Sequence, residues 1–204
     1  DSVDVLVKNA DIAMYKAKES GRNNYQFYNS AMNAAALDHL ILENKMRKAV
    51  EDKEFALHYQ PQINIKSGRI VGVEALLRWE DPVSGLIPSR DFIPLAEETG
   101  LIVPLGEWLF RQACRQAKNW VDAGYHPITM AVNLSGRQFK RRNVANMISE
   151  IMKEIGLDPR LLELELTESV LLQTEVNSTI LGEFVEQGIK LAIDDFGTGY
   201  SSLS

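Results

Sequence analysis

From Phe55 onward, segments with a strand-like pattern alternate with segments with a helix-like pattern, and this alternation limits the chain to few folds. The strand-like runs after the first hairpin cover 128–135, 161–168 and 190–196. The helical runs cover 91–99, 105–123, 143–155 and 176–187. Strands separated by helices form βαβ units, which place their strands in a largely parallel sheet. The chain is therefore predicted to adopt an α/β fold.

The first two strand-like runs form a different unit. ALHYQPQINI and IVGVEALLRW are separated by the turn residues Lys66-Ser67-Gly68-Arg69. Two such runs joined by a short glycine-containing turn indicate an antiparallel hairpin. Together with the later runs, this makes about five strands after residue 55, of which about four begin a strand-then-helix unit. A closed eight-stranded α/β barrel usually needs about 250 residues, so we expect an incomplete barrel.

The N-terminal region has a separate pattern. Residues 9–20 place small and apolar side chains on one helical face, and Gly21 follows as a stop signal. The aromatic run YQFY at 25–28 is interpreted as a short strand. A second helix is expected over 31–50, which contains neither Pro nor Gly and can connect two domains. Because the chain begins at Asp1 and stops in a Gly/Ser-rich loop, we expect both ends to be cut from a longer protein.

Composition narrows the possible partners and locations. A net charge of −6 argues against binding long nucleic acid. One cysteine, Cys114, excludes an internal disulfide, and its amphipathic helical surroundings favour simple packing over catalysis. No run approaches the roughly 18 apolar residues that cross a bilayer, and no signal peptide is visible. We expect a cytoplasmic domain, with membrane anchoring of a parent protein left open.

Oxygen-bearing side chains occur at or near the ends of four predicted strands. Glu74 and Arg78 share a face of the second hairpin strand, and Asn133, Glu165 and the Asp194-Asp195 pair lie near the ends of the next three. Parallel α/β folds place their active sites at the carboxyl ends of strands. Oxygen ligands without clustered His or Cys favour Mg²⁺ or Mn²⁺, and adjacent aspartates suggest a two-metal site for phosphodiester hydrolysis.

Each of these residues has an ordinary alternative role when taken alone. Glu74 and Glu165 fit paired or solvated carboxylates, Asn133 a turn residue, and Asp194-Asp195 a cap before the FGTG turn. The metal-site hypothesis depends on their joint placement at comparable strand ends.

Six segments resemble the EAL domain, a family of cyclic di-GMP phosphodiesterases. They are YQPQI (59–63), EALLRW (74–79), IPSRDFIPLAEETGLI (87–102), NLS (133–135), ELTES (165–169) and DDFGTGYSSLS (194–204). The resemblance implies a modified (β/α)8 TIM-like barrel with one antiparallel strand, which hydrolyses cyclic di-GMP to linear pGpG with Mg²⁺ or Mn²⁺. It also implies homodimerisation through the barrel.

The resemblance assigns roles to individual residues. It implies metal ligation by Glu74, Asn133, Glu165, Asp194 and Asp195, and places Glu74, Asp194 and Asp195 among the catalytic residues. Arg78 matches the arginine that contacts a substrate phosphate, Gln60 a further substrate contact, and Glu168 the glutamate that anchors the loop after Asp195.

Residues 10–28, ADIAMYKAKESGRNNYQFY, resemble the end of a GGDEF domain, the cyclase often fused ahead of EAL. We therefore predict a GGDEF remnant at 1–30, a connecting helix at 31–50, and the N-terminal two-thirds of an EAL domain at 51–204. A sensory region further N-terminal in the parent protein is also expected from the family.

The family pattern continues past Ser204 with a lysine and a water-activating glutamate. We therefore expect this piece alone to hydrolyse little, although the parent protein is active. The alternative is a catalytically silent EAL module that binds cyclic di-GMP or a protein partner as a sensor or scaffold. The downstream residues would discriminate between the two hypotheses.

Overall fold

The computed structural model describes residues 2–19, 23–141, 143–171 and 176–195, and the chain divides into two compact units, Asp1–Lys48 and Ala49–Ser204. The first unit contains α1 (Val3–Glu19) and most of α2 (Ser30–Asp52), which ends in the second unit. The rings of Tyr15 in α1 and His39 in α2 meet edge to face, with centroids 5.8 Å apart. The two helices predicted here are confirmed, although α1 begins earlier than expected.

The strand predicted at 25–28 is wrong. Residues 24–29 have no regular secondary structure, and none of the strands that the structure describes pairs with them. Tyr25 and Phe27 contact each other edge to face and are 78% and 80% exposed. A strand needs a hydrogen-bonded neighbour to be stable, and aromatic β-propensity alone does not supply one.

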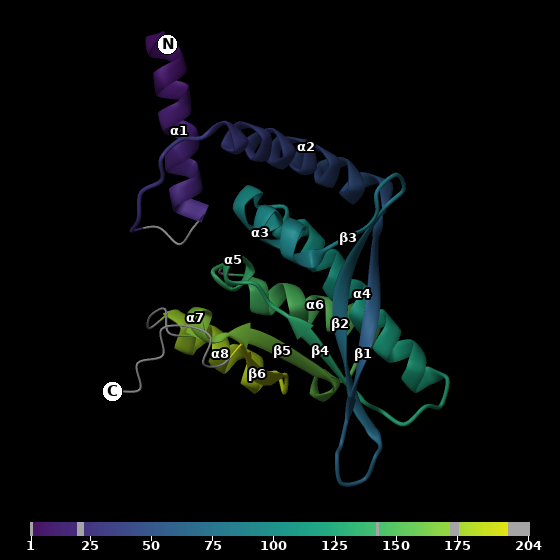
Figure 1. The fold of residues 1–204 in the computed structure, drawn as a ribbon. Helices are drawn as coiled ribbons and strands as arrows, with labels where there is room; N and C mark the ends of the chain where they lie inside the picture. Colours follow the sequence, from purple (N-terminus) through teal and green to yellow (C-terminus); the bar gives the residue numbers. More distant parts are fainter. Residues whose placement is uncertain (1, 20–22, 142, 172–175, 196–204) are drawn as a thin grey trace. The chain divides into compact units, whose positions relative to one another are not determined.

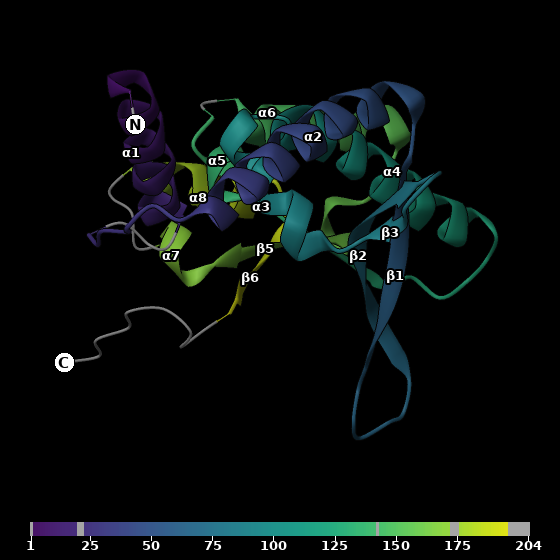
Figure 2. The same ribbon diagram turned by 45° about the horizontal axis from the view of Figure 1, so that its top comes forward.

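The second unit is built on a mixed sheet that begins with a long antiparallel hairpin (Figures 1 and 2). Its strands are β1 (Phe55–Ile63) and β2 (Ile70–Asp81). In the turn between them, the amide of Gly68 donates to the carbonyl of Asn64 at 2.8 Å. Gly68 has a φ of +68°, a conformation that glycine adopts without a Cβ penalty. The predicted hairpin and its turn are confirmed.

Three parallel strands continue the sheet: β4 (Thr129–Asn133), β5 (Leu162–Thr167) and β6 (Lys190–Asp194). The strand order is β1-β2-β4-β5-β6, and the short β3 (Gly85–Ile87) pairs with β2. The predicted α/β fold with a largely parallel sheet and one antiparallel hairpin is thus confirmed. With three residues, β3 is too short to show a periodic pattern in the sequence.

Helices connect the parallel strands, as predicted. The longer ones are α3 (Ser89–Thr99), α4 (Ile102–Asp122), α6 (Val144–Ile155) and α8 (Val176–Glu186). The shorter ones are α5 (Gly136–Phe139), the 3₁₀ turn η1 (Pro159–Leu161) and α7 (Glu168–Leu171). Among the described helices, none is long and apolar enough to cross a membrane.

The two faces of the sheet differ in chemistry. On β5, Leu162, Leu164 and Leu166 are at most 1% exposed, whereas Glu163 and Glu165 on the opposite face are half-buried. The apolar face packs with helices that include α4, in which Cys114 is fully buried. The burial of Cys114 is in line with the predicted packing role, and it raises the pKa of the thiol to about 12. The opposite face is left for polar side chains.

Candidate active site

The register of the parallel strands places the predicted site residues side by side. Asn133 on β4 pairs with Glu165 on β5, and Thr167 pairs with Asp194 on β6. Although β2 continues to Asp81, it runs parallel to β4 only over Gly72–Ala75. Glu74 therefore lies near the carboxyl end of the parallel part of the sheet, together with the other candidates.

Two of these side chains are in direct contact, because Nδ2 of Asn133 donates to Oε1 of Glu74 at 2.8 Å. The carboxyl group of Glu165 lies close enough to Glu74 for their charges to interact. Asp194 is close enough for its charge to act on Glu165. Its Oδ1 accepts from the amide of Asp195 at 2.8 Å.

Glu165 is the carboxyl group of this site whose pKa lies well above the ordinary value. Burial raises the pKa of Glu165 to about 7, and the negative charges of Glu74, Asp194 and Glu163 add to this shift. Neighbouring carboxylates that repel one another require a proton or a cation to neutralise them. The electrostatics of this site thus favour binding of a positive charge.

The shift predicts a pH dependence of stability in metal-free protein. A raised folded-state pKa contributes stability that is fully present below about pH 4.5 and is lost as pH rises through about 7. Because Glu165 is only half-buried, we expect a loss on the order of 1 kcal/mol between pH 5 and 8. Urea unfolding in EDTA at both pH values would measure it. The Glu165→Gln variant should lose less unfolding free energy over this range. Equal losses in the two proteins would contradict the assignment of the pH dependence to Glu165.

A cleft of about 300 Å³ lies at this end of the sheet. Its polar lining includes Arg78, Asn133, Glu165, Asp194 and Asp195, which brings five predicted site residues to one cavity. Glu74 is not part of the lining but contacts Asn133 directly. Gln60 pairs with Glu74 across the hairpin, on the same face of the sheet, and Glu168 begins α7 directly after β5. The lining includes neither of them.

The carboxylates do not form a finished metal cage. In the described ranges, no group of three or more His, Cys, Asp or Glu side chains could hold a metal ion as the side chains stand. Asn133 also turns its amide nitrogen, rather than its oxygen, toward Glu74. The strands thus bring the candidate ligands together, but the side chains have to rotate before their oxygens can share a cation.

Comparison with known proteins identifies the family. The family model of the EAL domain matches residues 43–204. The chain belongs to the EAL domain family. Over 199 residues, or 97% of the chain, it is 46% identical to the bifunctional diguanylate cyclase/cyclic di-GMP phosphodiesterase MucR of Pseudomonas aeruginosa. Over 200 residues, or 98% of the chain, it is 40% identical to the cyclic di-GMP phosphodiesterase PdeR of Escherichia coli.

The fold is also similar to a solved structure of the PaMucR phosphodiesterase in complex with c-di-GMP. The TM-score is 0.76 at 44% sequence identity, and the similarity covers 79% of this chain and 66% of that one. The chain spans 29% of the length of MucR and 30% of the length of PdeR.

Sequence reasoning missed the residues that hold the end of β4 in this EAL domain. Ser135 and Gln138 form a capping box, in which the amide of Ser135 donates to Oε1 of Gln138 at 3.0 Å. The amide of Leu134 donates to the carbonyl of Glu165 at 2.9 Å. A Cβ added at Gly106 of α4 would lie 1.6 Å from Nε2 of Gln138. The S-x-x-Q spacing after the strand could have indicated this cap.

We expect Gly106→Ala to disturb this cap and, through it, Asn133. Gln138 is 5% exposed and has little room to move, so overpacking should cost about 1–3 kcal/mol of unfolding free energy. Gly182→Ala in α8 is the matched control, because an added Cβ there meets nothing within 4 Å. Alanine there should stabilise the helix by about 0.5–1 kcal/mol. Equal effects of the two changes in urea unfolding would contradict the prediction.

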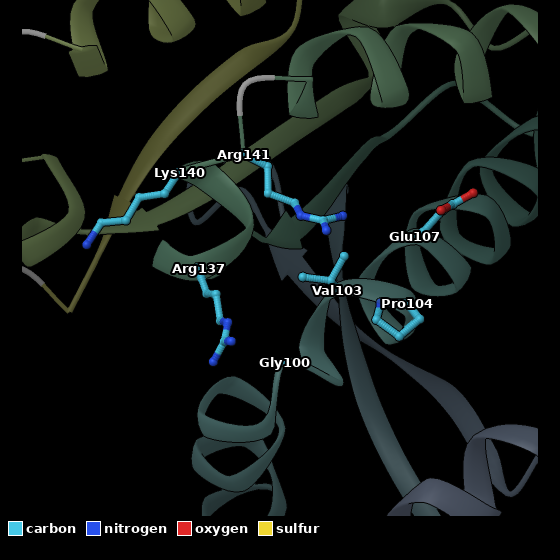
Figure 3. A pocket seen from close by; sticks show the side chains of 7 residues that line it. All are labelled: Gly100, Val103, Pro104, Glu107, Arg137, Lys140 and Arg141. Carbon is cyan, nitrogen blue, oxygen red and sulfur yellow. The ribbon is translucent and has the colours of Figure 1, made fainter.

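A second pocket of about 620 Å³ lies outside this site (Figure 3). Its lining includes the basic residues Arg137, Lys140 and Arg141, but these point in different directions (Figure 3). Arg137 points toward Gly100, and its Nη1 donates to the main-chain oxygens of Glu97 and Glu98, the latter at 2.7 Å. No residue predicted for the active site lines this pocket. Arg137 therefore serves to hold the C-terminal end of α3.

Proposed function

We propose that the protein carrying this chain hydrolyses cyclic di-GMP to linear pGpG in the cleft at the carboxyl end of the sheet. The observation that carries the proposal is the gathering of Asn133, which is hydrogen-bonded to Glu74, with Glu165 and Asp194 at one cleft of an EAL domain. MucR and PdeR, which match almost the whole chain, are both named as cyclic di-GMP phosphodiesterases. The similar PaMucR structure holds c-di-GMP.

We further propose that Glu74, Asn133, Glu165, Asp194 and Asp195 hold Mg²⁺ or Mn²⁺, in a site for two ions. The donors are carboxylate and amide oxygens, which suit these ions. The raised pKa of Glu165 supports the fit, because a nearby cation would favour its ionised form. When bound, such ions lower the pKa of a water molecule and neutralise phosphoryl charge. Asn133 has to turn its amide to present Oδ1 instead of Nδ2.

The remaining roles belong to the chain's own side chains. Arg78 lines the cleft, and its Nη1 donates to the carbonyl of Leu77 at 2.9 Å, which fixes the guanidinium beside the carboxylates. Its other N–H groups have no partner among the described residues, so they can donate hydrogen bonds to a phosphate. The amide of Asp195 orients the Asp194 carboxylate. Gln60 is proposed as a further substrate contact and Glu168 as the anchor of the segment that follows Asp195.

The N-terminal unit is proposed to derive from a GGDEF domain, with residues 1–30 as its end and 31–50 as the connecting helix. The alignment with MucR supports this, because it covers 97% of the chain and so extends well before residue 43, where the EAL match begins. MucR is named as a bifunctional cyclase and phosphodiesterase. Homodimerisation through the EAL domain and a fused sensory region stay predictions.

The function can be tested with the full-length protein that carries this chain. Cyclic di-GMP would be incubated with Mg²⁺ or Mn²⁺, and pGpG would be measured by liquid chromatography. We expect metal-dependent release of pGpG, abolished by EDTA. An Arg78→Ala variant should show a higher KM. Tight binding of cyclic di-GMP without any release of pGpG would support the silent binding module instead of the hydrolase. If the protein shows no binding and no turnover, both hypotheses are refuted.

A further inference from the structure

One acidic residue in the cleft has no part in the proposed metal site. Glu97 lies in the last turns of α3 and lines the same cavity as Arg78 and Glu165. It comes from a helix, whereas the proposed metal ligands come from the ends of β-strands or directly follow them. Its carboxylate is therefore supplied to the cleft independently of the metal site.

The Glu97 carboxylate has no hydrogen-bond partner among the residues that the structure describes. Arg137, whose charge acts on Glu97, donates to the main-chain oxygens of Glu97 and Glu98 instead. Arg137 thus acts on the carboxylate through its charge alone while it fixes the backbone that carries it. Burial raises the pKa of Glu97, and the charge of Arg137 opposes this shift. The Glu97 carboxylate is therefore available to accept hydrogen bonds from a ligand in the cleft.

Part of the cleft lining is apolar. Leu76, Ile93, Ile102 and Leu109 line the cavity together with Glu97 and the polar residues of the proposed active site. A small cavity with apolar walls and a few placed polar groups is typical of small-molecule sites. About 300 Å³ is at the small end of ligand pockets, so it suits part of a dinucleotide, such as one base, rather than the whole.

The chemistry of a carboxylate distinguishes between the two purines. The Watson–Crick edge of guanine presents two adjacent donors, N1–H and N2–H, and an ionised carboxylate accepts both. The same edge of adenine presents an acceptor at N1 beside its N6 donor, so it would face the carboxylate with a repulsive contact. Sites that hydrogen-bond a substrate group reject analogues that lack it far more strongly than apolar pockets do.

We propose that Glu97 determines base specificity, by accepting hydrogen bonds from the guanine edge of the cyclic dinucleotide against the apolar wall of the cleft. This inference rests on the proposed function, because it assigns the substrate of the same cleft. In this arrangement Arg137 is a positioning residue, because it holds the end of α3 that carries Glu97.

The test compares Glu97→Gln with Glu98→Gln in the full-length protein. Glu98 is the exposed neighbour on α3, and it does not line the cleft. Steady-state kinetics with Mn²⁺ would be measured on cyclic di-GMP and on cyclic di-AMP. For Glu97→Gln we expect kcat/KM on cyclic di-GMP to fall about ten- to hundred-fold, mainly through KM. The glutamine amide offers one donor and one acceptor, which match adenine, so the preference for guanine should shrink by more than that factor. Glu98→Gln should behave like the unchanged protein.

Equilibrium binding of both dinucleotides in EDTA separates this proposal from the proposed function. If the unchanged protein binds cyclic di-GMP in preference to cyclic di-AMP but turns neither over, the hydrolase fails while Glu97→Gln still tests the base contact. A preference that is unaltered in Glu97→Gln would overturn the proposal, even if kcat fell. A purely structural defect would lower the turnover of both dinucleotides by the same factor. Equal binding of the two dinucleotides by the unchanged protein would also overturn it.

Discussion

Replacing Glu165 with Gln should lower the rate of the proposed cyclic di-GMP hydrolysis by the full-length protein by about a thousand-fold or more. Glu165 is the central carboxylate of the site, since it is close enough to both Glu74 and Asp194 for their charges to interact. Glutamine has the same shape but no negative charge, so the variant loses a proposed metal ligand without leaving a cavity. Losing one placed electrostatic group in an active site typically costs 10²–10³-fold in kcat, and a shared metal ligand should cost more.

Glu163→Gln provides the matched control for this change. Glu163 lies two residues earlier on β5, on the same face, and pairs with Ala131 and Lys190 rather than with site residues. The charge of Glu163 also acts on Glu165, but less than the charges of Glu74 and Asp194 do. Because Glu163 is not a proposed ligand, its removal should change kcat less than about five-fold. A Glu165→Gln protein with more than a tenth of normal activity would show that this carboxylate is not a required ligand.

Much of the fold follows from periodicity that is visible in the sequence. On β5, leucines at 162, 164 and 166 alternate with polar residues, and the structure buries one set and leaves the other half-buried. On α4, buried positions such as Leu109, Ala113 and Ala117 recur at helical spacing. Such patterns are local, because a half-buried strand or helix repeats its environment every two or 3.6 residues.

The sequence-based predictions fail where the stability of a strand depends on contacts with residues that are distant in sequence. Tyr25 and Phe27 have high strand propensity, but no described strand pairs with them. The three residues of β3 form a strand because Trp79–Asp81 of β2 pair with them, and their own sequence shows no alternation. Propensity describes what a segment tolerates, and pairing decides what it becomes.

The candidate site divides in the same way. The proximity of Asn133, Glu165 and Asp194 could be predicted because parallel strands end at one edge of the sheet. The position of Glu97 in the cleft could not be predicted. It depends on how α3 packs and on the hydrogen bond from Arg137, which lies 40 residues later in the chain. The orientation of the Asn133 amide and the raised pKa of Glu165 also depend on distances between side chains, which the spacing of residues in the sequence does not contain.

Truncating Trp79 should be among the most destabilising single changes in the domain. Trp79 is 0% exposed and packs against the rings of Phe55 and Phe92, with centroids 5.6 and 5.8 Å away. Its Nε1 donates to Glu54 at 3.1 Å. Trp79→Ala leaves a large cavity and an unpaired acceptor, so we expect a loss of about 3–5 kcal/mol in the free energy of unfolding. Urea unfolding monitored by circular dichroism would measure it.

Trp79→Phe separates the two contributions. Phenylalanine keeps an aromatic ring in the cluster but loses the hydrogen bond to Glu54, so its cost should be nearer 1–2 kcal/mol. Because Trp79 points to the helix-covered face of β2 and Arg78 to the opposite face, Trp79→Phe should leave KM for cyclic di-GMP within about two-fold at temperatures where the protein stays folded. A large rise in KM with unchanged stability would mean that the aromatic cluster positions Arg78 directly, and that the two faces of the sheet are not independent.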